Sequence, residues 1–228
     1  MIPFIIVVFV VLIICLAVIS GLQAKKRRDA LQQWAATRGL SFSADSDSSI
    51  DNRYPKFSCL QEGDDRYAYN IMQGTIAGRS ILAFDYHYET HSTDSKGNRE
   101  TDDEEFSAVI VRPGLPLRPL SIRGETFFDK VGAFMGFEDI NFESAEFNRQ
   151  FFVKSPDRHW AFDVLNQQSM EFLLASPRFT LEMDDACVIA YHSKTFTTGD
   201  FESALNLIGG LLDRIPQSVL QDLKGTNA

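Results

Sequence analysis

The sequence predicts an α+β protein with a single N-terminal transmembrane helix, followed by a soluble domain that has a mainly antiparallel sheet and packed helices. Residues 3–22 form a long apolar run without charge. Strand-like segments come in pairs separated by short turns, which is typical of hairpins. Helical patterns do not alternate one for one with these strands, which argues against a doubly wound parallel sheet. We therefore expect a transmembrane anchor at 1–23, a juxtamembrane helix at 24–38, a polar linker at 39–53, a soluble α+β domain at 54–216 and a polar C-terminal tail at 217–228.

The apolar run Pro3–Leu22 predicts contact with the lipid bilayer. Fifteen of its twenty residues are Phe, Ile, Val or Leu, and about 20 apolar residues span a hydrocarbon core roughly 30 Å thick. A cleaved signal peptide is the alternative, but only Met1 and Ile2 precede the run and neither is basic. The pattern favours an uncleaved signal anchor.

The basic cluster after this run predicts the orientation of the chain. Basic residues remain on the cytoplasmic side of a membrane, so we expect a single-pass inner-membrane protein with its N-terminus outside and its C-terminal domain in the cytosol. The same side chains could also contact anionic lipid. The cluster comprises Lys25, Lys26, Arg27 and Arg28.

Composition narrows the range of partners and the redox compartment. The net charge of −9 disfavours nucleic acid, because its binding rests on basic side chains that neutralise phosphates. Beyond Cys15 only Cys59 and Cys187 remain, with no CxxC motif, which suits a reducing compartment. An inverted topology would permit a Cys59–Cys187 disulfide.

The soluble part begins with segments typical of strands. Tyr67–Gly74 and Ser80–Thr90 flank a turn at residues 76–79, and Phe106–Val111 resumes as a strand after a hydrophilic hairpin tip. Further short strands are expected at Leu120–Arg123 and Phe151–Lys154. A third hairpin is expected from Phe179–Met183 and Ala186–His192.

Helices are expected between and after these strands. Ala24–Arg38 places Leu31, Trp34 and Ala35 on one face, which we expect to pack on the domain. Glu125–Phe137 has helical apolar spacing. A further helix is expected to begin after Ser155, which acts as its N-cap. Two more helices are expected at Met170–Ala175 and at Phe201–Ile215.

One group of residues has the chemistry of a weak metal site. Asp85 and His87 share a face of their predicted strand, and His91 would join them if the strand continued that far. Imidazole and carboxylate together can bind a divalent transition metal. The alternative is an ordinary solvated strand face leading into a polar hairpin tip.

The segment Phe142–Leu174 resembles a family of membrane-anchored bacterial proteins that is described only as a domain of unknown function. The shared residues are packing positions and helix boundaries, so the resemblance implies a fold and no catalytic residues. Asn166-Gln167 stands where that family often has Thr-Pro. The residues that carry the resemblance are Phe142-Glu143, Glu146-Phe147, Phe151–Val153, Asp157, Ala161, Leu165 and Met170–Leu174.

The sequence contains no phosphate-binding glycine motif, no HExxH and no GxSxG. We therefore expect a non-catalytic, membrane-tethered module without a cofactor, which binds a protein partner. Two alternatives remain open: a metal-binding or metal-dependent hydrolytic enzyme that uses Asp85, His87 and His91, and a domain that binds lipid head groups.

Overall fold

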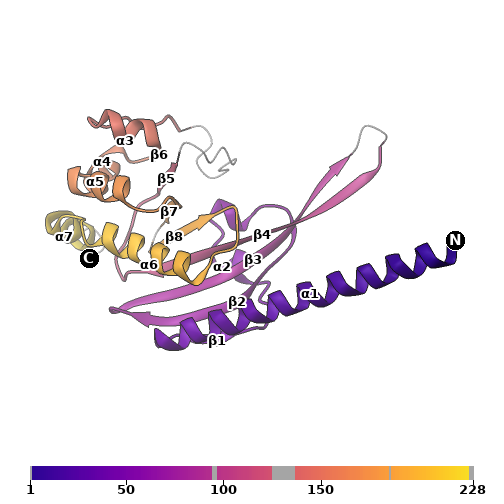
Figure 1. Ribbon diagram of the computed structural model, residues 1–228. Helices are drawn as coiled ribbons and strands as arrows, with labels where there is room; N and C mark the ends of the chain where they lie inside the picture. The colour runs from indigo at the N-terminus through magenta and orange to yellow at the C-terminus, as the bar shows by residue number, and fades with distance from the viewer. Residues whose placement is uncertain (1, 94–96, 125–136, 185, 226–228) are drawn as a thin grey trace.

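The computed structural model describes residues 2–93, 97–124, 137–184 and 186–225 (Figure 1). These residues form one antiparallel sheet of eight strands in the order β1-β2-β3-β4-β8-β7-β5-β6. The sheet agrees with the hairpin pattern of the sequence. The strands are β1 (Ser41–Ser43), β2 (Asp64–Ile76), β3 (Arg79–Thr93), β4 (Arg99–Arg112), β5 (Leu120–Gly124), β6 (Phe151–Lys154), β7 (Thr180–Asp184) and β8 (Cys187–His192).

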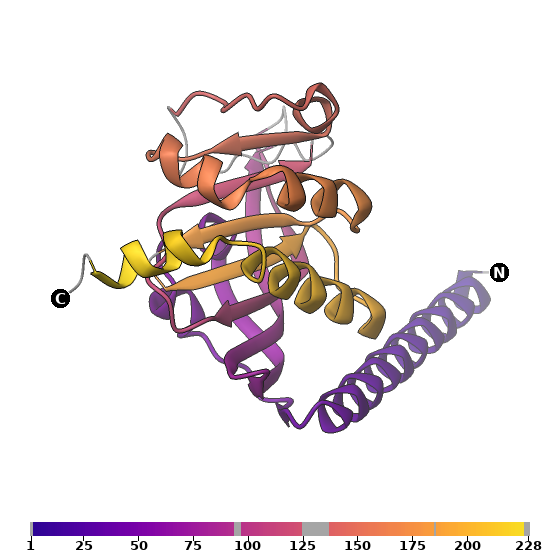
Figure 2. The ribbon, with the colours of Figure 1, turned by 90° about the vertical axis from the view of Figure 1, so that its left-hand side faces the viewer.

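Helices lie mostly on one face of this sheet (Figures 1 and 2). In Figure 2 the helices α4, α5 and α6 lie in front of the strands, while α1 runs from the bottom of the view to its right-hand edge. The helices are α1 (Ile2–Thr37), α2 (Ile50–Arg53), the 3-10 helix η1 (Ser58–Leu60), α3 (Ala145–Gln150), α4 (Arg158–Val164), α5 (Gln167–Ala175), α6 (Thr198–Leu212) and α7 (Gln217–Gly225).

The two faces of the sheet bury separate apolar cores because successive side chains of a strand point in opposite directions. On β3, Ile81 and Ala83 face the larger core under α1, α4, α5 and α6. Leu82, Phe84 and Tyr86 face a smaller core, which the α2–η1 segment covers. The alternation along this strand predicts Leu82, Phe84 and Tyr86 as its apolar face, but the side chains of Ile81 and Ala83 on the other face are buried too.

The C-terminal half of α1 is part of the folded body. Leu31 and Ala35 are buried in the larger core, and the ring of Trp34 lies 5.6 Å from that of Phe201 on α6. Packing of this helix on the domain is therefore confirmed. Towards the N-terminus α1 leaves the body (Figure 1), and the described apolar side chains there are more than half exposed: Ile14, Val18, Ile19 and Leu22.

In the part of the chain that the structure describes, no helix combines the length and the apolar character needed to cross a bilayer. A crossing needs about 20 consecutive apolar residues. The side chains of residues 1–13 and 15–17 lie outside the described ones. The finding contradicts the transmembrane anchor predicted at 1–23, and with it the signal anchor and the single-pass inner-membrane location.

Three other segments differ from the sequence-based expectation. The predicted linker at 39–53 contains β1 and α2, because Ile50 is fully buried in the smaller core. The predicted polar tail forms α7. The N-cap of α4 is Asp157, which accepts from the backbone of Trp160, while Ser155 donates to the carbonyl of Pro119. The helix expected at 125–137 lies almost wholly outside the described residues.

The β3–β4 hairpin extends beyond the body as an arm (Figure 1). The two strands stay paired from Ser80 opposite Arg112 to Thr93 opposite Arg99. Residues 99–105 are all exposed. The predicted hydrophilic tip is thus mostly regular two-stranded sheet.

Candidate functional site

A buried ion pair joins α1 to the centre of the sheet. The guanidinium of Arg27 donates to both carboxylate oxygens of Asp85, from Nε to Oδ2 at 3.0 Å and from Nη2 to Oδ1 at 2.6 Å. Asp85 is fully buried, and the Arg27 side chain is 28% exposed. Two parallel hydrogen bonds of this kind fix the orientation of both groups.

Other polar groups complete the coordination of this pair. Ser107 Oγ donates to Asp85 Oδ1 at 2.5 Å, and Asn70 Nδ2 donates to Oδ2 at 2.9 Å. Asn70 has a φ of 50°, a conformation that Asn tolerates better than most residues, and it lies in an irregularity of β2. Arg27 Nη1 also donates to the carbonyl of Phe196 at 2.7 Å. The network links α1, three strands and the segment before α6.

This network changes the role expected for two residues. Burial lowers the pKa of Arg27, but the hydrogen bond and the negative charge of Asp85 raise it, and the net direction is upward. Arg27 thus holds α1 on the sheet, whereas Lys25, Lys26 and Arg28 are exposed. The sequence had grouped all four as one basic cluster, because adjacent charges on a helix look alike until their faces are known.

The structure does not bring together the three residues of the predicted metal site. Asp85 is engaged by Arg27. His91 Nδ1 lies 3.0 Å from Thr101 Oγ1, and its Nε2 lies 3.5 Å from Asp64. Strand β3 does continue to Thr93, so His91 shares the face of His87, but four residues of strand separate them by roughly 13 Å. One metal ion cannot bridge that gap.

The strand face of Asp85 and His87 is also not solvated. Asp85 is 0% exposed and His87 is 8% exposed. The Tyr67 ring stacks on the imidazole of His87 with centroids 4.7 Å apart. A polar pattern on this strand therefore marks buried polar contacts rather than a surface.

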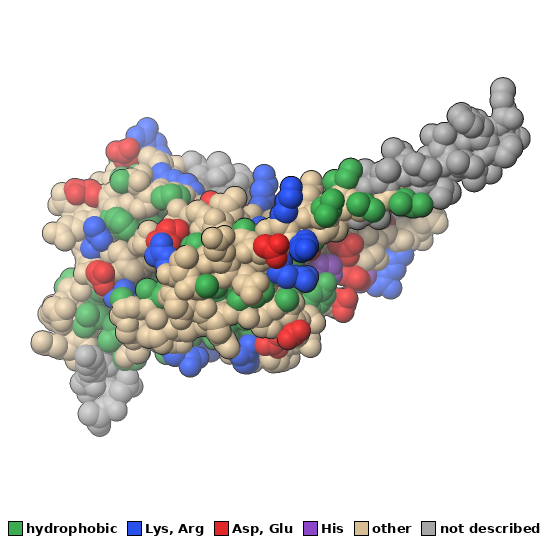
Figure 3. Space-filling model, turned by 60° about the horizontal axis from the view of Figure 1, so that its bottom comes forward, with side chains coloured by type: hydrophobic (Ala, Val, Ile, Leu, Met, Phe, Trp, Pro, Cys, Tyr) green, Lys and Arg blue, Asp and Glu red, His purple; other side chains and the backbone are tan. Residues whose placement is uncertain are grey.

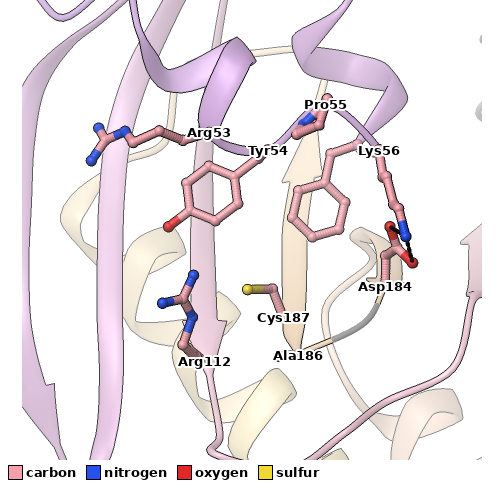
Figure 4. Close-up of a pocket in the computed structure, with 9 residues that line it drawn as sticks. Arg53, Tyr54, Pro55, Lys56, Arg112, Asp184, Ala186 and Cys187 are labelled. Carbon is pink, nitrogen blue, oxygen red and sulfur yellow. Dashed lines mark hydrogen bonds and ion pairs between the residues drawn. The ribbon is translucent and has the colours of Figure 1, made fainter.

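A second feature is a cavity of about 180 Å³ at the end of the sheet where β4, β7 and β8 meet the α2–η1 segment (Figure 4). Figure 4 shows the Tyr54 ring, the guanidinium of Arg112 and the sulfur of Cys187 around one hollow. Three basic side chains and one acidic side chain line it. The lining residues are Arg53, Tyr54, Pro55, Lys56, Phe57, Arg112, Asp184, Ala186 and Cys187.

The basic side chains of this cavity have different partners. Arg53 pairs with Asp47 at 2.6 Å, outside the cavity, and Lys56 pairs with Asp184 at 3.4 Å. A hydrogen bond to the Cys187 side chain raises the pKa of Arg112, so this guanidinium stays charged. Among the described residues, no carboxylate forms an ion pair with Arg112.

The apolar part of the cavity comes from rings and small side chains. Burial raises the pKa of Tyr54, and the positive charges of Arg112 and Arg53 offset part of that rise. Its phenol is therefore neutral and can donate a hydrogen bond. A charged guanidinium beside a neutral phenol and the Phe57 ring can hold an anionic group that carries a short apolar stem.

Sequence reasoning missed this cavity. The run Arg53-Tyr54-Pro55-Lys56 fell at the boundary between the predicted linker and the domain, and Arg112 follows an ordinary strand. The one local signal for this cavity is that each basic residue of the run is followed closely by an aromatic one, Tyr54 after Arg53 and Phe57 after Lys56. Its meaning depends on the β4–β8 pairing, which joins segments far apart in the chain.

No protein-family model matches the sequence, and no curated protein matches it. The resemblance of Phe142–Leu174 to membrane-anchored bacterial proteins therefore remains a prediction. A structural match is the crystal structure of the mycobacterial trehalose monomycolate transport factor A, TtfA, with a TM-score of 0.61 and 13% sequence identity. The match covers 83% of this chain and 96% of that chain, and it shows a shared fold.

Proposed function

We propose that this protein is a non-catalytic binding module that holds an acidic segment of a partner protein in the cavity beside Arg112. The observation that carries the proposal is a basic hollow on a chain whose net charge is −9. The positive charge of Arg112, which pairs with no carboxylate among the described residues, attracts an anionic group to the hollow. The net negative charge of the chain repels such a group elsewhere.

The size of the cavity supports a small anchor rather than a large ligand. Its volume of about 180 Å³ lies below the roughly 300–1,000 Å³ of pockets that enclose drug-sized molecules. A single carboxylate side chain with its methylene stem is the kind of group that such a space accepts. Arg112 would then form a charge-assisted hydrogen bond with the carboxylate.

The likeness to TtfA supports the same class of function, because TtfA is a transport factor. A binding role associated with transport is therefore the broader function that we infer for this chain. The fold likeness does not carry a substrate over to it.

Binding of a labelled hexaglutamate peptide to the full chain tests the proposal, with fluorescence anisotropy as the readout. We expect Arg112→Glu to weaken binding about 10-fold or more, because it replaces attraction by repulsion. Arg99→Glu is the matched control: it makes the same change of charge on the exposed hairpin arm. Equal effects of the two substitutions, or no binding of the peptide to the wild-type chain, would overturn the proposal.

A lipid phosphate is the second candidate for this cavity, because arginine binds phosphate and carboxylate with similar geometry. Co-sedimentation with vesicles that contain phosphatidylserine separates the two. Binding to these vesicles that Arg112→Glu abolishes, together with no binding of the peptide, would assign the cavity to a lipid head group.

The alternative of an enzyme built on Asp85, His87 and His91 receives no support from the geometry. The Asp85 carboxylate accepts hydrogen bonds from Arg27, Asn70 and Ser107. Each of these bonds would compete with a metal ion for the oxygen lone pairs.

A further inference from the structure

Three side chains with metal-binding atoms converge where the hairpin arm leaves the body. They are Asp65 on β2 and both His87 and Glu89 on β3. One ligand atom from each lies within 4.8 Å of the others. Among the described residues, these three form the one group of at least three His, Cys, Asp and Glu side chains whose ligand atoms lie this close together.

The backbone of β2 places Asp65 in this group. The pairing of β2 with β3 shifts register between Asp64 and Tyr67, so an irregularity interrupts the ladder there. Asp65 has a φ of 46°, which redirects its side chain relative to a regular strand. On β3, His87 and Glu89 share a face by simple alternation.

The imidazole of His87 is held in place by packing, and its nitrogens have no hydrogen bond to another described residue. His87 is 8% exposed, and the Tyr67 ring stacks against it. Within the described part of the chain no hydrogen bond joins the imidazole to another residue, and its nearest charged partner is Asp103, with 3.9 Å between Nε2 and Oδ1. Among the described residues, the ring nitrogens of His87 do not belong to the enclosed polar atoms that lack a hydrogen bond. They therefore reach solvent, and a metal ion could replace that solvent.

The surrounding charges favour a cation. Glu89 lies opposite Asp103 and His87 lies opposite Glu105 in the β3–β4 ladder. Like charges directly across a ladder destabilise it. Figure 3 shows both acidic and basic side chains beside a histidine on one face of the molecule. A bound cation would replace this repulsion by attraction.

We propose that Asp65, His87 and Glu89 form a binding site for a divalent first-row transition metal of the zinc class, with Asp103 within reach as a fourth ligand. One imidazole with two or three carboxylates suits Zn²⁺, whereas sites made only of oxygen suit Mg²⁺ or Ca²⁺. Ligand atoms around tetrahedral zinc lie roughly 3.4 Å apart. The ligand atoms, which lie within 4.8 Å of one another, must therefore approach by up to about 1.4 Å, and the exposed side chain of Asp65 permits this movement.

This site differs from the one that the sequence suggested. It keeps His87 and replaces Asp85 and His91 by two carboxylates from the foot of the arm. Because its ligands come from β2 and β3, bound metal would cross-link the two strands where the regular ladder is interrupted.

Isothermal titration of the full chain with ZnCl₂ tests the proposal. We expect one site in the wild-type chain, and His87→Ala should weaken its affinity at least 10-fold. His91→Ala and His159→Ala are the matched controls and should bind as the wild type does. His159 is a useful control because it is a histidine on an exposed helix surface that pairs with a carboxylate, Asp163, at 2.9 Å.

A second variant protects the test against a folding defect of His87→Ala. Asp65 is exposed, so Asp65→Asn should keep the fold, as circular dichroism would verify, and still weaken zinc binding. Zinc should also raise the melting temperature of the wild type and of His91→Ala more than that of Asp65→Asn. No zinc binding by the wild type, or unchanged affinity in both His87→Ala and Asp65→Asn, would overturn the proposal.

Discussion

Arg27 on α1 and Asp85 on β3 are 58 residues apart in the chain and form a bidentate ion pair in the interior. The pair makes α1 part of the domain rather than an appendage. Both charges have further hydrogen bonds, from Asn70 and Ser107 to Asp85 and from Arg27 to the Phe196 carbonyl. A buried pair with all its partners present is tolerated, whereas one half of it alone is costly.

Removal of the cation should therefore destabilise the protein strongly. Arg27→Ala leaves the fully buried Asp85 without its counterion, and we expect the free energy of unfolding to fall by about 3–5 kcal/mol. Urea denaturation followed by circular dichroism measures this change. Lys26→Ala is the control, because its exposed neighbouring side chain should contribute less than about 0.5 kcal/mol. Equal stability of the two variants would refute a structural role for the pair.

The apolar contact of α1 makes a separate contribution. Leu31 is 1% exposed in the larger core. Leu31→Ala should lower the free energy of unfolding by about 2–5 kcal/mol through lost burial and the cavity that remains. The exposed Gln33 two residues later is the control, and Gln33→Ala should have almost no effect in the same urea experiment. A small effect of Leu31→Ala would mean that α1 is not docked in solution.

A buried carboxylate predicts a pH dependence of stability. Glu182 is 1% exposed and accepts from Tyr191 and Ser58. Burial raises its pKa above the ordinary value of 4.5, although these hydrogen bonds offset part of the rise. Between the unfolded and the raised folded pKa the native state holds more protons than the unfolded state, so stability falls as pH rises through this window.

Glu182→Gln should remove this contribution, because glutamine does not ionise. We expect the free energy of unfolding of Glu182→Gln relative to wild type to increase between pH 4 and pH 7, as measured by urea denaturation at several pH values. Glu143→Gln, at an exposed position, is the control. If the difference in unfolding free energy between Glu182→Gln and wild type does not change with pH, a raised pKa of Glu182 is contradicted.

Two adjacent glycines of α6 should respond oppositely to alanine. A Cβ at Gly210 would overlap the ring of Phe172 on α5, which also lies under the guanidinium of Arg214. A Cβ at Gly209 would meet only Arg79 Nη1 at 3.5 Å. Gly210→Ala should therefore lower the melting temperature. Gly209→Ala should raise it slightly, because alanine favours the helix over glycine by about 1 kcal/mol. Thermal denaturation of both variants measures this; the same direction of change in both would disprove the tight α5–α6 contact.

Local patterns in the sequence were enough to predict most elements of the fold. The alternation on β3 predicts that Leu82, Phe84 and Tyr86 share one face, because the period of a strand is a property of adjacent residues. It does not predict that the opposite face is buried as well. The turn between β2 and β3 is predicted for the same reason. The sequence places the N-cap of α4 two residues early, since Ser155 and Asp157 are both good caps and the choice depends on Pro119, which lies far away in the chain.

The candidate sites depend on pairings that no local pattern contains. The sequence pattern around Asp85 is that of a surface ligand, because no local signal indicates that Arg27 on α1 pairs with it. The sequence also indicates His87 as a candidate ligand, but its neighbour Asp65 enters the group through an irregularity of β2. The hollow beside Arg112 exists because β4 pairs with β8, and these strands are separated by most of the C-terminal half.

The position of β8 in the sheet has a consequence for synthesis of the chain. Residues 107–111 of β4 pair with residues 188–192 of β8, and this ladder joins the first four strands to the other four. A nascent chain that ends before Cys187 therefore exposes the N–H and C=O groups along one edge of β4. Such an edge can pair with another nascent chain, so the growing polypeptide is vulnerable to aggregation until its last strand has left the ribosome.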